Sequence, residues 1–389
     1  MPEINSPAPS GPQPSSVGKT PRQTALLPNT LKVVELGETV ATALCGRFLL
    51  KLGAEVTRVL PTDTSSGIIG LGPTAGVGER PAITEWLNPG KVLTELDFAD
   101  THDRQRLEQV LREADVVLVA GTSRQWDQIG LSIDEIDELA HHAVIGRITP
   151  WGDSGPYSEL LGGELQYQAV SGFMRLMGES DQEPVRLGGY PMQAIAGLLA
   201  LDGVMIGLFA RESTGEGSRF STSEFEASAH AEWKIATTVQ AGFPKEVRGE
   251  DKGSVVVRCR DGHFALFYIP SNWDAVKAVI GDPRLDDESF ATPRSRELNR
   301  IRLIEVIEET TISMSKIDLY YATQRHNIPA GYVATMTDLL SSPQYISRNF
   351  FERVDGDDAR PGVIPNVPWQ VFTSDDYLLT KDHQEEVQA

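Results

Sequence analysis

The feature that most restricts the fold is a regular alternation of apolar strands and amphipathic helices over residues 31–148. Predicted strands occupy 31–36, 55–60, 91–96, 115–120 and 143–148, and predicted helices occupy 39–52, 101–114 and 132–141. In the first helix, Leu44, Phe48 and Leu52 share one face, and Gly53 ends it. Strands that alternate with helices form a parallel sheet covered on both faces. We therefore expect an α/β fold with a Rossmann-like large domain.

The rest of the chain predicts a smaller α+β domain. Residues 254–269 read as two strands around an Asp261-Gly262 turn, a strong hairpin signal. Helical patterns follow near 272–280, 294–310 and 315–325, and the last fifty residues read as irregular. The expected division is a flexible tail (1–28), a large α/β domain (29–224), a small α+β domain (225–335) and a C-terminal segment (336–389). The tail is assigned from composition, because it holds seven of the 24 prolines.

Charge and composition exclude several classes of protein. The chain has 35 Lys and Arg against 55 Asp and Glu, which gives a net charge of −20. This charge repels phosphate backbones and argues against nucleic-acid binding. Cys45 and Cys259 are too few for a disulfide framework or a cysteine metal site, which is typical of a reducing compartment. No signal-peptide pattern is present, so we expect a cytoplasmic protein. The apolar stretch 194–210 contains Asp202 and is interpreted as a buried helix, with no membrane association.

Generic catalytic motifs do not account for the chain. The glycines between 67 and 78 do not fit G-x-G-x-x-G and are interrupted by Pro73, so a dinucleotide site is disfavoured. His141 and His142 are adjacent, which is poor ligand geometry, and no metal site is predicted. The nucleophile motif G-x-S-x-G of many serine hydrolases is also missing.

An ordered series of segments carries a more specific signal. It comprises Leu31–Leu36 with Leu49–Val59, Leu87–Asp97, Gly152–Tyr157 (Gly-x-x-Gly-Pro-Tyr), Gln168–Met174, Arg211–Gly217 and Ile328–Val333. Together these segments resemble the class III CoA-transferases of the CaiB/BaiF type over about residues 31–375. The resemblance implies a discontinuous large domain to which the C-terminal segment (336–389) returns, a small domain late in the chain, and two chains threaded together as interlocked rings.

The resemblance also implies acyl-CoA chemistry, from which this sequence departs. In the family, an aspartate attacks the donor thioester and forms a mixed anhydride, a reaction that requires an ionised carboxylate. Counted back from Arg211, that position is Gln193, whose amide cannot form the anhydride. The histidine of the related racemases falls at Gly163. Glu164 matches an acidic family position, either as a structural carboxylate near a helix start or as a polar group facing the cleft.

The positions that contact CoA in the family are partly altered. Lys91 is retained and Arg58 stands where a lysine is common, whereas Val40 and Ala120 replace polar family residues. A phosphate-bearing ligand needs fixed cationic donors. We therefore expect no tightly bound cofactor, with coenzyme A or acyl-CoA as a weak ligand at most.

Three functions remain open. The first is a non-nucleophilic subunit of a hetero-oligomeric acyl-CoA:carboxylate CoA-transferase, because some family members, such as benzylsuccinate CoA-transferase, pair a complete subunit with a paralogue lacking the aspartate. The second is a homodimeric enzyme with lyase, hydratase or isomerase chemistry, in which Gln193 donates a hydrogen bond to an oxyanion and Glu164, Gln166 and Tyr167 supply polar or acid/base groups. The third is an ordinary transferase with a displaced carboxylate. The expected partner is a paralogous subunit or a second copy of the chain.

Overall fold

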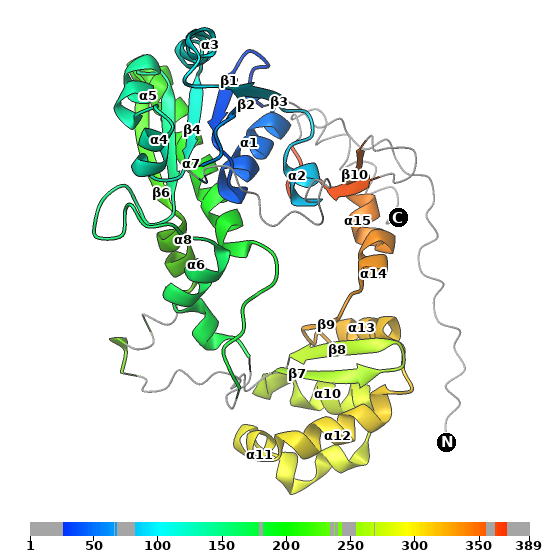
Figure 1. Ribbon diagram of the computed structural model, residues 1–389. Coiled ribbons are helices and arrows are strands. Elements are labelled where there is room, and N and C mark those ends of the chain that lie inside the picture. The colour runs from blue at the N-terminus through cyan, green and yellow to red at the C-terminus, as the bar shows by residue number, and fades with distance from the viewer. Residues whose placement is uncertain are drawn as a thin grey trace. The chain divides into compact units, whose positions relative to one another are not determined.

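The computed structural model describes residues 26–65, 67, 82–178, 182–233, 237, 240–242, 254–267, 269–354 and 362–371. The chain divides into two compact units, 1–248 with 347–389 and 249–346 (Figure 1). These limits differ from the expected domain limits of 225 and 335. Most of the expected tail lies outside the described residues, but Leu26 and Leu27 both donate backbone hydrogen bonds to Leu52 O, at 2.9 and 2.8 Å. The end of the expected tail is therefore attached to the large unit.

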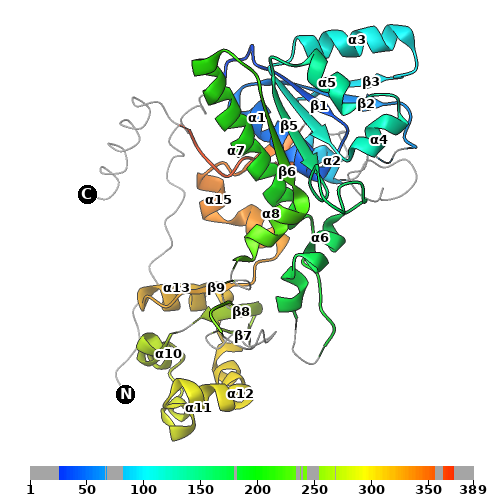
Figure 2. The ribbon, with the colours of Figure 1, turned by 90° about the vertical axis from the view of Figure 1, so that its left-hand side faces the viewer.

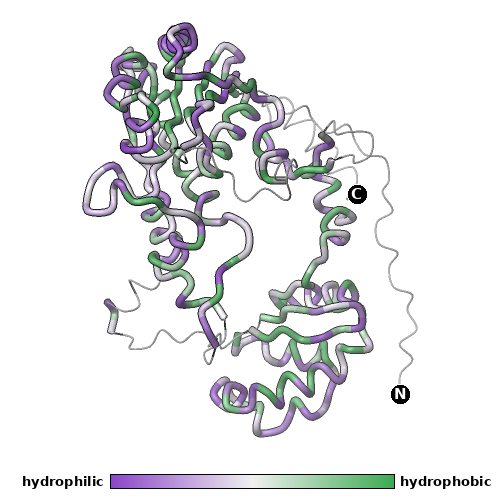
Figure 3. The backbone as a smooth tube through the Cα atoms, viewed as in Figure 1, coloured by the Kyte–Doolittle hydropathy of each residue, from purple (hydrophilic) through white to green (hydrophobic). Residues whose placement is uncertain are grey.

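The large unit is built on a six-stranded sheet. The sequence predicts an α/β fold with a parallel sheet, and this is what the structure has. Its strands are β1 (Lys32–Leu36), β2 (Glu55–Pro61), β3 (Val92–Leu96), β4 (Val116–Ala120), β5 (Val144–Thr149) and β6 (Ser218–Ser223). They lie in the order β3-β2-β1-β4-β5-β6, and every neighbouring pair is parallel. The central strand β4 is hydrophobic (Figure 3) and fully buried. This strand order places β1 and β4 at the point where the direction of winding reverses.

Helices cover both faces of the sheet (Figure 2). One face carries α1 (Val40–Leu52), α2 (Ala82–Leu87) and α7 (Pro191–Thr214), and the other carries α3 (Thr101–Arg112), α4 (Ser123–Gln128) and α5 (Ile133–Leu139). Val33 belongs to the hydrophobic cluster under α1, and its neighbour Val34 belongs to the cluster on the opposite face. This alternation is the period-2 geometry of a strand that is buried on both sides.

Helix α1 begins and ends where the sequence predicts, because a capping residue stands at each end. Thr39 is its N-cap, and the Thr39 hydroxyl accepts a hydrogen bond from Thr42 N at 3.2 Å. Gly53 ends the helix in the left-handed conformation, with φ of 119°.

Other elements differ from expectation. Helices α2 and α4 lie in segments for which the sequence predicts neither a helix nor a strand, and α4 begins with a capping box between Thr122 and Gln125. Helix α14 (Met336–Ser341) ends just inside the last fifty residues, which were expected to be irregular. That expectation is wrong in part, because these residues contain α15 (Pro343–Ser347) and the antiparallel pair β10 (Phe351–Val354) and β11 (Gly362–Pro365). Arg47 of α1 donates to Glu352 Oε1 at 2.7 Å and to Pro365 O at 3.0 Å, so this pair is joined to α1.

The second unit is a small α+β structure. Strands β7 (Ser254–Cys259), β8 (Gly262–Phe267) and β9 (Ala330–Tyr332) form an antiparallel sheet, with the expected turn at Asp261-Gly262. Its helices are α10 (Trp273–Ile280), α11 (Pro293–Leu298), α12 (Arg300–Thr311) and α13 (Lys316–Arg325), with short 3₁₀ helices η2 (Pro270–Asn272), η3 (Pro283–Asp286) and η4 (Glu288–Phe290).

Helix α7 is only half-buried, although the sequence predicts a buried helix. It has 24 residues, and an 18-residue window within it has a mean hydropathy of 1.8, so by length and composition it could cross a membrane, a test that core helices also pass. Its inner face is close to the sheet, since a Cβ at Gly207 would lie 2.5 Å from Val144 Cγ1. Its outer face leaves Ile206 69% and Phe209 78% exposed. An apolar stripe is therefore uncovered in the single chain.

Candidate functional site

The first candidate site lies where α6 (Glu164–Val170) meets the start of α7. Glu164 Oε1 accepts from Met192 N and Glu164 Oε2 accepts from Gln193 N, both at 3.1 Å. Tyr190 stands at the N-cap of α7 and provides no side-chain cap. Glu164 therefore satisfies free N–H groups of a helix that cannot cap itself, and its negative charge suits that end of the helix dipole.

Gln168, which the sequence analysis missed, holds Glu164 in place. Gln168 Nε2 donates to Glu164 Oε1 at 2.7 Å and to Leu187 O at 3.3 Å, while Gln168 Oε1 accepts from Leu187 N at 2.8 Å. The Gln168 side chain is buried and lies one turn after Glu164 on the same helix. The i,i+4 spacing was visible in the sequence, but the segment around Leu187 that completes the bonding was not.

The four residues predicted for catalysis are separated by the fold. Gln193 and Glu164 are brought together, although through the backbone of Gln193. The half-buried Gln193 side chain makes no hydrogen bond to any other described residue. Gln166 is exposed on the outer side of α6, and Tyr167 is buried and faces a different partner.

That partner is Glu224, the first residue of α8 (Glu224–Ala231), a helix that packs on both α6 and α7. The Tyr167 hydroxyl interacts with the buried Glu224 carboxyl group, and Glu224 Oε1 has no hydrogen-bond partner among the described residues. The Trp151 ring packs beside Tyr167 and Phe225, with centroid distances of 5.8 Å and 5.3 Å. No sequence pattern distinguishes Glu224 from a surface glutamate.

Burial sets the chemistry of the Tyr167–Glu224 pair. Burial raises the pKa of Glu224 to about 8; the interaction with Tyr167 opposes this shift, and the nearby Glu164 charge adds to it. Burial also raises the pKa of Tyr167 well above its usual range, with the Glu224 charge as the next contribution. At neutral pH, Glu224 is therefore mainly a neutral carboxylic acid.

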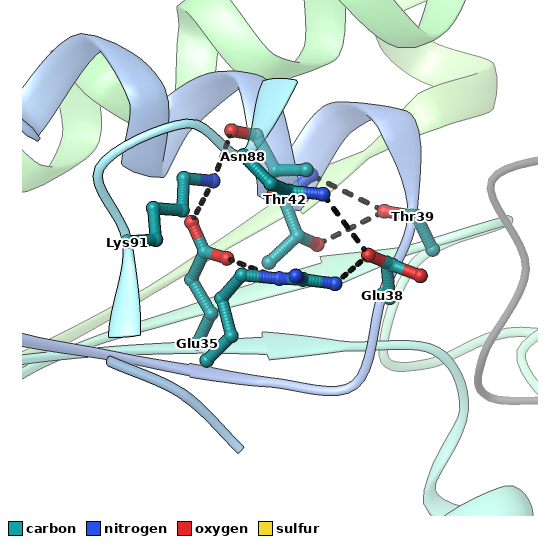
Figure 4. A network of polar contacts seen from close by, with 8 residues as sticks. Glu35, Glu38, Thr39, Thr42, Asn88 and Lys91 are labelled. Atoms are coloured by element: carbon teal, nitrogen blue, oxygen red, sulfur yellow. Dashed lines mark hydrogen bonds and ion pairs between the residues drawn. The ribbon is translucent and has the colours of Figure 1, made fainter. Parts of the chain in front are cut away.

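The second candidate site is a buried network at β1 and β2 (Figure 4). Glu35 on β1 and Arg58 on β2 are register partners, and Arg58 Nε lies 3.9 Å from Glu35 Oε2. The other end of the guanidinium donates to Glu38, which follows β1, and Asn88 Nδ2 donates to Glu38 Oε1 at 3.3 Å. Arg58, Glu35 and Glu38 are all buried.

Lys91, just before β3, completes this network. Its Nζ donates to Glu35 Oε1 at 2.6 Å and to Ala43 O at 2.7 Å. Burial is the largest influence on both partners: it raises the pKa of Glu35 and lowers that of Lys91, while their attraction opposes each shift. Gly46 of α1 lies directly over this pair, since a Cβ there would overlap Glu35 Oε1.

The four positions predicted for CoA contacts are therefore all internal. Arg58 and Lys91 face two carboxylates in a balanced cluster, and Val40 and Ala120 are buried in the start of α1 and the end of β4. Trp126 Nε1 donates to Ala120 O at 2.7 Å. Neither cation is free to hold a phosphate in this arrangement.

The two sites are joined by a close helix contact. Gly197, one turn after Gln193, packs on the first turn of α1, where a Cβ would lie 2.7 Å from Ala41 O and 3.3 Å from Leu44 Cβ. Only glycine allows this approach. The position of Gln193 therefore depends on the position of α1.

One group of possible metal ligands occurs among the described residues, formed by Asp100, His102 and Asp103. Asp100 caps α3 and Asp103 Oδ2 accepts from Asp97 N at 3.0 Å. Helix capping explains this exposed group without a metal.

The profile of CoA-transferase family III matches residues 29–379. The chain is 24% identical over 357 residues to succinate–glutarate CoA-transferase of Agrobacterium fabrum, covering 88% of each chain. It is 28% identical over 286 residues to the succinyl-CoA:(R)-benzylsuccinate CoA-transferase subunit BbsE of Thauera aromatica, covering 69% of this chain and 68% of that one. A CaiB/BaiF family protein from Brucella suis has a similar crystal structure, with a TM-score of 0.76, 26% identity, and coverage of 89% of this chain and 92% of that one.

Proposed function

The chain belongs to CoA-transferase family III, and on that basis we propose that it is the non-nucleophilic subunit of a hetero-oligomeric acyl-CoA:carboxylate CoA-transferase. One observation carries the proposal: the first turn of α7 presents the amide of Gln193 at the position where the resemblance puts the nucleophilic aspartate. An amide is a poor nucleophile and cannot give the mixed anhydride.

The carboxyl groups near Gln193 do not replace the missing nucleophile. Glu164 is buried, and both of its oxygens accept backbone N–H groups of α7. Glu224 is buried, and its pKa of about 8 keeps it mainly protonated at pH 7. Attack on a thioester needs an ionised, accessible carboxylate, which neither residue supplies.

A partner subunit would supply the nucleophile. The relative from Thauera aromatica is named as a subunit of a benzylsuccinate CoA-transferase, which supports a multi-subunit enzyme here. The exposed stripe of α7, with Leu198, Ile206 and Phe209, provides an apolar face for such a partner. We propose the interlocked dimer of this family as the form of association, with a paralogue that carries the aspartate.

The proposal gives this chain a supporting role in CoA binding. Arg58 and Lys91 are held by Glu38 and Glu35, so they do not offer the fixed donors that a CoA diphosphate needs. Any binding of CoA by this chain alone is expected to be weak. The enzyme is expected in the cytoplasm.

The test is to trap the covalent intermediate. The purified chain would be incubated with succinyl-CoA, treated with hydroxylamine and analysed by peptide mass spectrometry. Gln193→Asp would be analysed alongside it, together with Gln193→Asn, an amide control that is isosteric with the aspartate variant. We expect no modified residue in the wild type or in Gln193→Asn. A hydroxylamine-sensitive acyl group on any wild-type carboxylate would overturn the proposal and indicate a transferase with a displaced nucleophile.

A second candidate function is favoured by the Tyr167–Glu224 pair. A neutral carboxylic acid at pH 7 can act as a general acid, and the Gln193 amide can donate to an oxyanion. This combination suits a homodimeric enzyme with lyase, hydratase or isomerase chemistry. Its expected signature is a homodimer that retains activity in the absence of a paralogue.

A further inference from the structure

The Glu38–Arg58 ion pair lies at the point of the sheet where α/β folds of this type take up ligands. Strand β1 has β2 on one side and β4 on the other, and the chain reverses its winding direction there. Ligands of such sheets bind outside the carboxyl ends of the strands at this point. Glu38 follows the carboxyl end of β1 by two residues and directly precedes Thr39, the N-cap of α1.

The groups around Glu38 are those that would hold an anion. Arg58 donates to Glu38 Oε1, and Asn88 Nδ2 donates to the same oxygen at 3.3 Å. Figure 4 shows Glu38 and Asn88 within this network. The 13-residue helix α1 begins immediately after it, with no acidic residue in its first turn. An arginine, an amide donor and a helix N-terminus are a common combination around ligand phosphates. Here the negative charge is supplied by the chain itself.

We propose that Glu38 closes this site to phosphate-bearing ligands by acting as an internal substitute for the ligand's anionic group. Arg58 and Glu38 are both buried, so the guanidinium is already neutralised and shielded from solvent. A diphosphate could bind Arg58 only by displacing Glu38 and leaving two negative charges close together. Glu38 therefore determines ligand selectivity at this point of the fold.

Arg58 is the cation whose access to an external anion depends on Glu38. Lys91 is fully buried, and its ammonium is satisfied by Glu35 and by Ala43 O beneath α1. Arg58, by contrast, makes only a long 3.9 Å contact with Glu35 through its Nε, and its terminal nitrogen faces Glu38. Loss of the Glu38 charge would leave that end of the guanidinium available to an external anion.

This inference deepens the proposed function and rests on it in one respect: a subunit that does not form the acyl-enzyme has no need for a charged CoA diphosphate pocket. The two can fail separately. Trapping of the acyl group concerns Gln193 and requires turnover, whereas anion binding at Arg58 is measured without any reaction.

The test is calorimetric titration of the full chain with inorganic pyrophosphate and, separately, with coenzyme A at low ionic strength. Four proteins would be compared: wild type, Glu38→Gln, the double variant Glu38→Gln/Arg58→Met, and the exposed-acid control Glu85→Gln. We expect Glu38→Gln to bind both probes about tenfold or more tightly than the wild type, as gain of a charge-assisted bond implies. The double variant and Glu85→Gln are expected to bind no better than the wild type.

Two results would overturn the proposal. One is a folded Glu38→Gln protein, judged by circular dichroism, with no gain in affinity; the other is an equal gain in the double variant, which would place the anion away from Arg58. If Glu38→Gln does not fold, wild type and Arg58→Met are compared instead. Binding of pyrophosphate that is present in the wild type and lost in Arg58→Met would show that the site is open, whereas equal, weak binding by both is the result expected for a closed site.

Discussion

The backbone N–H of Gln193 is bound by the carboxylate of Glu164 at 3.1 Å. This bond crosses from the first residue of α6 to the first turn of α7, and a second bond to Met192 N at 3.1 Å accompanies it. Glu164 is thus a helix cap supplied by another helix. The contact positions Gln193, the residue that the family resemblance places at the reaction centre. It also engages both oxygens of Glu164 in hydrogen bonds to the backbone.

Replacement of Glu164 should weaken the start of α7. In Glu164→Gln one oxygen becomes an NH₂ group that faces a backbone N–H, so one cap is lost and a donor is left unpaired. We expect a loss of about 1–3 kcal/mol in the free energy of unfolding, measured by urea denaturation. Glu212→Gln, at the exposed far end of α7, is the matched control and should change stability by less than about 0.5 kcal/mol. Equal stability of both variants would contradict the capping role.

The pKa of Glu224, raised to about 8, predicts a stability that falls as pH rises. Between about pH 4.5 and pH 8 the unfolded chain has released this proton while the folded chain retains it. Folding is therefore favoured at the acid end of this window and loses up to about 1.4 kcal/mol per pH unit across it.

Urea denaturation at several pH values checks this slope. The isosteric variant Glu224→Gln should remove the contribution, so the difference in unfolding free energy between variant and wild type should grow with pH. Glu226→Gln, an exposed residue of the same helix, should leave the slope unchanged. A wild-type slope that survives in Glu224→Gln would show that another group is responsible.

Gly197→Ala should destabilise the protein in spite of the higher helix propensity of alanine. Propensity alone favours alanine by about 1 kcal/mol, but its Cβ would lie 2.7 Å from Ala41 O. We expect a net loss of about 1–3 kcal/mol, read as a lower midpoint of thermal or urea unfolding. Gly188→Ala is the matched control, because nothing lies within 4 Å of a Cβ there. A stabilised Gly197→Ala protein would refute the close contact between α1 and α7.

Phe209→Asp should disrupt association without unfolding the chain. Phe209 is 78% exposed, so the substitution removes little buried area from the chain itself, but a charge would be costly in an apolar interface. Sedimentation velocity should show a shift toward monomer, with unchanged circular dichroism. Ile301→Asp in the second unit is the control, because Ile301 is also 78% exposed. An unaltered oligomer in Phe209→Asp would exclude this stripe from the interface.

The sequence predicts the parallel sheet because strand patterning is local: Val33 and Val34 need only alternate for both faces of β1 to be covered. The burial of α7 is not local, since an apolar composition does not say whether Phe209 packs within the chain or against another one. The hairpin of β10 and β11 was missed for a similar reason, because its stability depends on Arg47, which lies some 300 residues away in the sequence.

The sites show the same limit. Arg58 and Lys91 were identifiable as the retained cations, but their neutralisation follows from strand register, which places Glu35 opposite Arg58. Glu164 was identified from the sequence, and a structural role near a helix start was one of the two interpretations given for it. Glu224 had no signal in the sequence, since its burial results from the packing of α8 against α6 and α7.

Native mass spectrometry of the chain purified gently from its own host tests the central claim most directly. The account predicts a complex of this chain with a paralogue that carries an aspartate at the position equivalent to Gln193. A homodimer or a monomer, with no paralogue in stoichiometric amount, would contradict the assignment of this chain as a non-nucleophilic subunit.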